Sequence, residues 1–380
     1  MARTEIRGFD AVRAAARDIE HYSSDLLGDR DVRDYRQLPL EADPPRHTLF
    51  RQAVQPLFHS DAIAQHTEAY RALARKLIDQ VAEAEVPLDV PSQIALPYVI
   101  GCLCINYNRP GDYDEWLSWG PDVWTADAYR TGSLREESEL AHRERDFAAE
   151  SDRDGSTLQA YLDRVFDEAE RKIAAGEPSV DAWDFVARLE VDGVAINRKE
   201  MQGIANVLLA GGRDTVIKLI TGLVWHLINS PADREFLVDT PNKYQSAMDE
   251  LVRYLSPLPK MERIKPEYLG LGDMERPEEA YVLLSWASAN HDPSAWTAPE
   301  SIDIHRGRQP HLGFGHGKHS CMGMNVTEYE TKAFLAELLG NWPDWKFAAP
   351  PDIAWVTETG ADGGGFTLLD RFRGLAVEPA

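Results

Sequence analysis

The feature that most constrains this chain is a glycine-rich loop that carries a single cysteine. Residues 311–323 read HLGFGHGKHSCMG, and a segment typical of a helix start follows them. The first turn of a helix and the neighbouring His and Lys side chains favour the thiolate form of Cys321. A thiolate on a rigid loop can ligate a soft or borderline metal, and haem iron fits this arrangement. The alternative is a glycine-rich surface loop in which the cysteine occurs by chance.

The fixed residues of this loop resemble the haem-binding signature of the cytochrome P450 family. Phe314-Gly315-x-Gly317-x-His319-x-Cys321-x-Gly323 matches that signature at every fixed position. By this resemblance Cys321 is the metal ligand of the chain, the axial thiolate of haem b (iron protoporphyrin IX). Glycines let backbone amides point at the sulfur and let the chain pass close to the porphyrin. Phe314 would pack beside the ligand and shield it from water.

Composition narrows the class of protein. The net charge of −23 at pH 7 argues against nucleic-acid binding, because a phosphate backbone requires a basic surface. Cys102, Cys104 and Cys321 do not form a disulfide framework, and we interpret the first two as core residues of a helix. No apolar run approaches the roughly 20 residues that cross a bilayer. We therefore expect a soluble, cytoplasmic protein without a membrane anchor.

Helical periodicity dominates the chain. Apolar residues recur at helical spacing over residues 68–81, 158–175, 199–228, 241–255 and 325–339. Strand-like patterns cover residues 280–286, 356–357 and 366–369. Prolines between residues 257 and 299 break the chain into an irregular meander that leads to the Cys321 loop. These patterns predict a mainly α fold with a small β-rich part.

The resemblance extends from about Phe9 to about Val377 and implies a cytochrome P450 fold. We therefore expect a single large domain over residues 1–380. The N-terminal part looks shorter than is usual for the family, which puts the usual N-terminal strand and helix in doubt. Two consequences remain open: a more open substrate pocket, or a surface that another subunit covers.

A second motif places two nitrogen-bearing side chains on one helix face. Residues 43–45, Asp-Pro-Pro, predict a helix start with a capping carboxylate and proline in the first turn. His47 and Arg51 follow four residues apart and therefore share a face. Alone, such a pair is usually solvated. Asp-Pro-Pro-x-His-x-x-x-Arg also resembles the family's helix that binds a haem propionate, and the same resemblance adds Arg263 and His311. Two buried propionates need several donors.

Glu250 and Arg253 lie three residues apart, on one turn of a predicted helix. As a surface ion pair they would contribute only a few tenths of a kcal/mol. They resemble the family's buried Glu-x-x-Arg pair, which implies a role in folding and haem retention. The family's usual Arg and Phe in the meander are replaced by Ser and Ile at residues 301–302. Either Arg306 or His305 then completes the network.

Residues 208–215, LLAGGRDT, lie within the longest helical pattern. Each mid-helix glycine costs about 1 kcal/mol relative to alanine, and Thr215 and Asp214 can leave a local groove in the helix. One interpretation is a kink for close helix packing. The other is that Gly211 makes room for a flat cofactor and dioxygen. The segment resembles the family's distal motif, in which Thr215 would hydrogen-bond the activated oxygen and Asp214 would help to relay protons.

The resemblance implies a haem-thiolate monooxygenase that activates O2 and inserts one oxygen atom into a small or medium apolar organic molecule. The acid and alcohol pair favours O2 over peroxide, because cleavage of the O–O bond needs two protons. The chain has no flavin or nicotinamide fingerprint. We therefore expect NAD(P)H-derived electrons to arrive through a ferredoxin reductase and a ferredoxin. The expected docking site is a basic patch formed by Arg46, His316, Lys318 and Lys332.

Two alternatives remain for the function. One is an enzyme of the same fold that performs a non-hydroxylating oxidation, such as coupling, nitration, rearrangement or peroxide use. The other is a haem sensor without catalysis.

Overall fold

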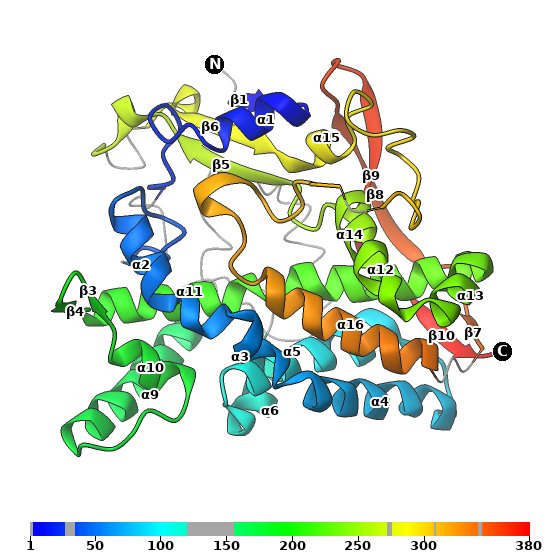
Figure 1. Ribbon diagram of the computed structural model, residues 1–380, viewed down its shortest axis with the longest axis horizontal. Coiled ribbons are helices and arrows are strands. Elements are labelled where there is room, and N and C mark those ends of the chain that lie inside the picture. Colours follow the sequence, from blue (N-terminus) through cyan, green and yellow to red (C-terminus); the bar gives the residue numbers. More distant parts are fainter. Residues whose placement is uncertain (1–2, 27–34, 120–155, 272–275, 308, 341–343) are drawn as a thin grey trace.

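The computed structural model describes residues 3–26, 35–119, 156–271, 276–307, 309–340 and 344–380, and Figure 1 shows their arrangement. The helices are α1 (Phe9–Ala15), α2 (Arg46–Val54), α3 (Ser60–Ala64), α4 (Thr67–Glu83), α5 (Leu96–Asn106), α6 (Tyr113–Ser118), α9 (Ser156–Ala174), α10 (Ala182–Ala187), α11 (Arg198–Gly211), α12 (Asp214–Asn229), α13 (Pro231–Asp239), α14 (Tyr244–Leu255), α15 (Trp286–Asn290) and α16 (Met324–Gly340). The strands are β1 (Thr4–Ile6), β2 (Leu88–Asp89), β3 (Glu190–Val191), β4 (Val194–Ala195), β5 (Lys260–Ile264), β6 (Tyr281–Ser285), β7 (Trp345–Phe347), β8 (Asp352–Thr359), β9 (Gly365–Gly374) and β10 (Ala376–Pro379).

The structure confirms the predicted mainly α fold and corrects one helix. α4, α9, α14 and α16 occupy predicted helical segments. β8 and β9 contain two of the predicted strands, and β6 forms only residues 281–285 of the third, because Trp286 begins α15. Residues 199–228, however, form two helices: α11 ends at Gly211 and α12 begins at Asp214. A Cβ on Gly212 would lie 2.9 Å from the Leu103 side chain, so α5 packs directly against the interruption. Tertiary packing therefore reinforces the low helix propensity of glycine.

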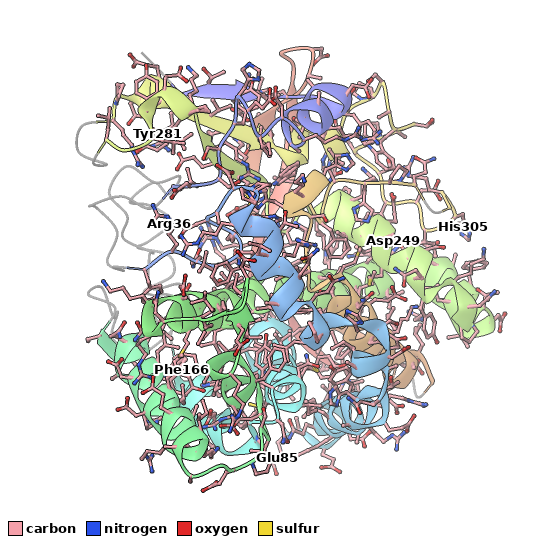
Figure 2. All side chains as sticks on the ribbon, turned by 60° about the vertical axis from the view of Figure 1, so that its left-hand side comes forward. Arg36, Glu85, Phe166, Asp249, Tyr281 and His305 are labelled. Atoms are coloured by element: carbon pink, nitrogen blue, oxygen red, sulfur yellow. The ribbon has the colours of Figure 1, made fainter. Side chains whose placement is uncertain are left out.

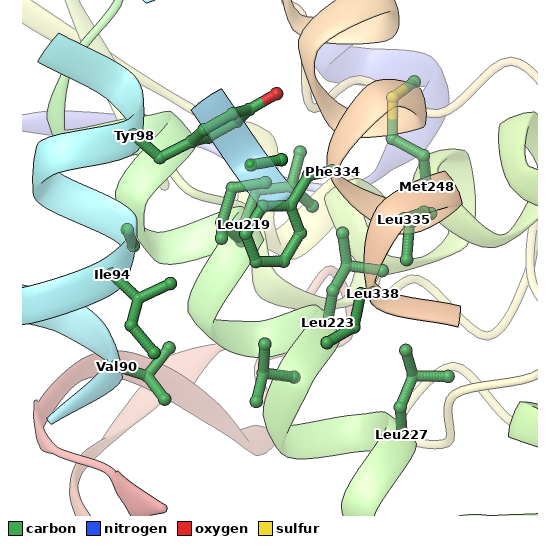
Figure 3. Packing of buried hydrophobic residues seen from close by; sticks show 14 of the residues in the cluster. Val90, Ile94, Tyr98, Leu219, Leu223, Leu227, Met248, Phe334, Leu335 and Leu338 are labelled. Atoms are coloured by element: carbon green, nitrogen blue, oxygen red, sulfur yellow. The ribbon is translucent and has the colours of Figure 1, made fainter. Parts of the chain in front are cut away.

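α11 and α12 together cross the molecule, and α12 contributes to the main hydrophobic core (Figures 1 and 3). A Cβ on Gly222 of α12 would lie 2.5 Å from the Leu255 side chain, so α12 and α14 approach closely. On the opposite side, the ring centroids of Tyr98 and Phe334 lie 5.2 Å apart and join α5 to α16. Other buried members of this core are Val90, Ile94, Leu219, Leu223, Leu227, Met248, Leu335 and Leu338.

Small sheets surround this helical body. β1 pairs in parallel with β6, and β6 pairs antiparallel with β5, so the three strands have the order β1-β6-β5. β8 and β9 form an antiparallel hairpin. A Cβ on Gly8 would lie 2.8 Å from the Cβ of Ala361, so the segment between β1 and α1 packs on the tip of this hairpin.

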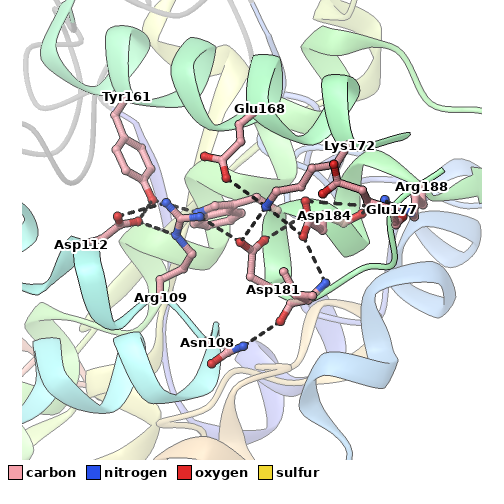
Figure 4. A network of polar contacts seen from close by, with 12 residues as sticks. Asn108, Arg109, Asp112, Tyr161, Glu168, Lys172, Glu177, Asp181, Asp184 and Arg188 are labelled. Atoms are coloured by element: carbon pink, nitrogen blue, oxygen red, sulfur yellow. Dashed lines mark hydrogen bonds and ion pairs between the residues drawn. The ribbon is translucent and has the colours of Figure 1, made fainter. Parts of the chain in front are cut away.

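A buried polar network joins the chain after α5 to α9 and α10 (Figure 4). The Arg109 guanidinium donates to Asp112 at 2.7 Å and to Asp181 at 2.8 Å. Burial opposes the charge of Arg109, but hydrogen bonds with both carboxylates raise its pKa overall. Tyr161 donates to Asp112 at 2.7 Å and accepts from the Trp183 indole at 2.8 Å. Because each buried charge has a partner, the network fixes these helices without an isolated charge.

Candidate functional site

The Cys321 loop turns through two glycines with left-handed backbone. Gly315 has φ +67° and Gly317 has φ +75°, a conformation that favours glycine. A Cβ on Gly317 would lie 2.7 Å from the carbonyl oxygen of Ala16, so the loop contacts the end of α1 too closely for a side chain. The backbone N–H of Cys321 donates to the Phe314 carbonyl at 2.8 Å and closes the turn. The loop therefore fixes Cys321 just before α16.

Hydrogen-bond donors and a cation surround the Cys321 sulfur. Burial raises the pKa of the thiol, whereas the backbone N–H groups of Gly323 and the following residue, with the Arg51 guanidinium, act to lower it. These N–H groups lie at the start of α16, where the helix dipole is positive. Cys321 also has exposed surface, whereas Cys102 and Cys104 are buried in α5, as predicted. Cys321 is thus an exposed residue whose sulfur is supplied with hydrogen-bond donors, as a metal-bound thiolate requires.

Four side chains predicted to bind haem lie together beside this loop and form a cationic cluster: His47, Arg51, Arg263 and His319. The rings of His47 and His319 have centroids 4.1 Å apart. Arg51 Nη1 donates to the Ser320 carbonyl at 2.7 Å, which ties α2 to the loop. Arg263 on β5 is buried and donates to the backbone carbonyl of Glu262 at 2.7 Å. The structure therefore brings these predicted residues together from three parts of the chain.

The cationic cluster is rich in buried donors. Burial first, and then the charge of Arg263, lowers the pKa of His319 to about 2. Burial and the charge of Arg51 lower the pKa of His47 to about 4, and burial lowers the pKa of Arg263 to about 10. Neither ring nitrogen of His47 or His319 has a hydrogen-bond partner among the described residues. Buried unpaired polar groups are costly. The cluster therefore fits a group that carries two carboxylates, as haem does.

Asp43 does not cap α2, contrary to the prediction. α2 begins after Pro45 without a side-chain cap. The Asp43 carboxylate instead accepts hydrogen bonds from Ser23 Oγ at 2.5 Å and from the Ser24 backbone at 3.0 Å. Its charge acts to raise the pKa of His47. Asp43 therefore moderates the charge near the cationic cluster and anchors the preceding segment.

His311 has protein partners at both ring nitrogens. Nδ1 accepts a hydrogen bond from the Gly313 backbone at 3.1 Å, and Nε2 lies 3.8 Å from Oδ1 of Asp249. An imidazole that accepts at Nδ1 carries its proton at Nε2 and directs it toward that carboxylate. This geometry does not support a propionate contact, and that role of His311 stays a prediction.

The break between α11 and α12 contains the predicted distal residues. A Cβ on Gly211 would meet no atom within 4 Å among the described residues, so this position faces open space. Thr215 Oγ1 donates to the Gly211 carbonyl at 3.4 Å, across the break. The Asp214 carboxylate pairs with the buried Arg213 guanidinium. The segment thus offers an accessible hydroxyl and an anchored carboxylate on one helix start.

Glu250 and Arg253 form the predicted buried pair, and Arg306 completes it. Arg253 donates to the two Glu250 carboxylate oxygens at 2.9 and 2.7 Å. Arg306 Nε donates to Glu250 Oε2 at 3.2 Å. His305 instead lies at the periphery, where Figure 2 shows it, and its ring is 3.7 Å from Asp233. The geometry settles the open alternative in favour of Arg306.

Asn290 was not singled out from the sequence, although it positions the Cys321 loop. Its Oδ1 accepts from the Leu312 backbone at 2.7 Å and its Nδ2 donates to Ser256 Oγ at 3.0 Å. Its backbone carbonyl accepts from Arg253 at 2.8 Å. The side chain therefore connects the loop to the end of α14. A polar residue just after the strongly apolar run of β6 is the only sequence signal for it.

Known proteins similar to this chain are cytochrome P450s. The Cytochrome P450 family model matches residues 244–348, which include α14, the Cys321 loop and α16. The chain is 28% identical to probable cytochrome P450 127A1 of Sinorhizobium fredii, over 81% of this chain and 69% of that protein. It is 24% identical to 6-deoxyerythronolide B hydroxylase of Saccharopolyspora erythraea, over 92% and 85% of the two chains. A solved structure of a carbohydrate active P450 superposes with a TM-score of 0.76 at 25% identity, over 98% and 91%.

Fold, motifs and relatives together define the class of protein: the chain belongs to the cytochrome P450 family. It is a monooxygenase of the bacterial type within that family, whose members contain haem with a cysteine thiolate ligand. Of the helices in the described part of the chain, none combines the length and the hydropathy needed to cross a membrane.

Proposed function

We propose that Cys321 provides the axial thiolate of haem b and that the cationic cluster binds its propionates. The observation that carries this proposal is an exposed cysteine, its sulfur supplied with hydrogen-bond donors, in the same loop as the His319 ring, whose buried nitrogens have no hydrogen-bond partner among the described residues. Haem, when bound, supplies the oxidising chemistry, in which electrons and O2 yield one oxygen atom for the substrate. When haem is bound, Phe314 would shield the thiolate from water, and Gly315 and Gly323 would let the backbone of the loop approach the cofactor.

We infer that Thr215 and Asp214 deliver protons on the distal side. The hydroxyl of Thr215 makes only a long hydrogen bond to the Gly211 carbonyl, at 3.4 Å, so it can turn to another acceptor. The Asp214 side chain is 39% exposed, and its ion pair with Arg213 fixes its position. A carboxylate in contact with solvent beside an alcohol can pass protons inward. Gly211 leaves the space in front of this pair open.

Replacement of Thr215 by valine should separate proton delivery from haem binding. The variant keeps the shape of the side chain and removes the hydroxyl. We expect product formed per NAD(P)H consumed to fall by at least about tenfold, with haem content unchanged. T221V is the matched control, because Thr221 is fully buried on the same helix and its hydroxyl has no partner among the described residues. Equal coupling in T215V and wild type would exclude the proton role of Thr215.

The proposed substrate is a small or medium organic molecule with an apolar body. Relatives include 6-deoxyerythronolide B hydroxylase and mycinamicin IV hydroxylase/epoxidase, whose names describe oxidation of organic small molecules. A screen for compounds that shift the resting haem spectrum from low to high spin would find ligands. Oxidation of the best ligand under ¹⁸O2 should place one labelled atom in the product. A product without label would favour a non-hydroxylating oxidation.

We propose that electrons arrive from a ferredoxin and its reductase, at a basic surface centred on α1 and the Cys321 loop. Two of the four residues expected there are already paired: Arg46 with Glu200 at 3.0 Å and Lys332 with a carboxylate of α16 at 2.5 Å. His316 and Lys318 remain, and Arg17 Nε donates to the His316 ring at 2.8 Å. Burial, and then the charges of Arg17 and Arg13, lower the pKa of His316. We call Arg13, Arg17, His316 and Lys318 the α1 patch.

Charge reversal in the α1 patch should slow reduction by ferredoxin. We expect R17E/K318E to lower the rate of ferredoxin-driven reduction about tenfold at low ionic strength, and the difference to shrink with added salt. Reduction by dithionite should be unchanged, because it needs no docking. R46E/K332E is the control, because both cations are neutralised within the protein. A larger effect in this control than in R17E/K318E would place docking elsewhere.

A further inference from the structure

Lys218 lies on α12, three residues after Thr215, in the interior of the molecule. Residues three apart in a helix share a face, and the rise between them is about 4.5 Å along the axis. Both side chains are partly accessible, whereas Val216, Leu219 and Ile220 around them are buried. The accessible strip of α12 therefore presents a hydroxyl and an amine side by side.

The amine of Lys218 has no hydrogen-bond or ion-pair partner among the described residues. Asp214, four residues earlier, would be its ordinary helical partner, but it pairs with Arg213. Asp370 of β9 is near enough to act on the Lys218 charge, but it accepts a hydrogen bond from Arg371 at 3.1 Å. Asp214 and Asp370 are therefore each paired with an arginine. The positive charge of Lys218 has no carboxylate of its own among the described residues.

His291 of α15 adds a second uncommitted group. Its Nδ1 donates to the Ala287 carbonyl at 3.0 Å, so Nε2 carries a lone pair, and this buried atom has no hydrogen-bond partner in the described part of the chain. The charge of Lys218 contributes to the low pKa of His291, after burial and the charge of Arg253. The ring stacks on Phe366 of β9 with centroids 4.7 Å apart. An apolar ring and an unpaired ammonium thus occupy the same region between α12, α15 and β9.

Even partial burial of the Lys218 ammonium is unfavourable without an anion. Burial lowers the pKa of Lys218 to about 8, while the charge of Asp370 acts to raise it and that of Arg371 to lower it. Buried charges in proteins are normally paired. A negatively charged group of a bound ligand would offset the desolvation cost of the Lys218 ammonium.

We propose that Lys218 binds a carboxylate of the substrate, so that the enzyme oxidises an organic acid with an apolar body. This inference rests on the proposed function. A carboxylate held at Lys218 would place the body of the molecule along α12, and a carbon a few bonds from the acid group would lie beside Thr215. Lys218 is thus a specificity-determining residue rather than a catalytic one.

The test compares acids with their methyl esters on the haem-loaded enzyme. A panel of alkanoic and arylalkanoic acids, each beside its ester, is titrated against the low-to-high-spin shift. We expect at least one acid to bind about tenfold or more tightly than its ester, as expected for a charged hydrogen bond. K218M should abolish this preference and leave ester affinity intact, whereas K218R should retain it. K243M, at an exposed lysine, is the control.

The pH dependence gives an independent readout. Acid affinity should fall as pH rises through about 8, where Lys218 loses its proton, and ester affinity should not. Asp370, Arg371 and His291 are the charged or titratable groups near it. The proposal is wrong if esters bind as well as acids, if no acid binds, or if K218M keeps the preference. Loss of the thiolate–haem spectrum in wild type would instead contradict the proposed function.

Discussion

Replacement of Cys321 by serine is expected to abolish the red-shifted ferrous–carbon monoxide Soret band and all monooxygenase turnover. A serine hydroxyl is a far weaker donor to iron than a thiolate, which favours cleavage of the O–O bond by donating electron density. The donors around residue 321 belong to the backbone of the loop and to Arg51, so they survive the substitution. The expected loss therefore reports the sulfur itself and not the fold of the loop.

Cys104→Ser is the matched control, since Cys104 is a buried thiol remote in sequence from the loop. It should keep the red-shifted band, with some loss of stability because a polar hydroxyl enters a hydrophobic cluster. Haem content and the carbon monoxide difference spectrum of both purified variants provide the comparison. A C321S protein that retains the band, or a C104S protein that loses it while folded, would contradict the assignment of Cys321.

The parts of the site that follow local spacing were predictable, and the parts set by distant contacts were not. The loop around Cys321 and the His47–Arg51 spacing on α2 are local patterns, and both hold in the structure. The end of α11 depends on Leu103 of α5, which packs against Gly212. Spacing along the chain carries no information about such a contact.

Two further outcomes depended on three-dimensional geometry. Asp43 accepts hydrogen bonds from Ser23 and Ser24 instead of capping α2. The sequence pattern of a helix start contains no information about these partners. Arg306 and His305 are adjacent in sequence, yet only Arg306 reaches Glu250. In both cases the residue types indicate which side chains could interact, but only the three-dimensional course of the backbone determines which of them are in contact.

Arg253→Met is expected to destabilise the protein by about 3–5 kcal/mol, because it breaks a fully buried ion pair. Beyond the bonds to Glu250, Arg253 donates to three backbone carbonyls, those of Asn290, Pro299 and Ser301, each at 2.8 Å. Methionine fills much of the volume but satisfies none of these acceptors. Since Asn290 also holds the start of the Cys321 loop, the variant should lose haem as well as stability. Haem content and thermal unfolding measure both effects.

Two comparisons separate the causes of this loss. E250M/R253M removes both charges, so it should recover part of the stability if the Glu250 carboxylate, left with Arg306 as its only charged partner among the described residues, is the main cost. The three carbonyls stay unpaired, so recovery should be incomplete. K332M removes a half-exposed pair on α16 and should change stability by at most about 1 kcal/mol. An R253M protein as stable as K332M would show that the Glu250–Arg253 network is dispensable for stability. Full recovery of stability in E250M/R253M would show that the destabilisation in R253M comes entirely from the Glu250 charge left without Arg253 and not from the lost bonds to the three carbonyls.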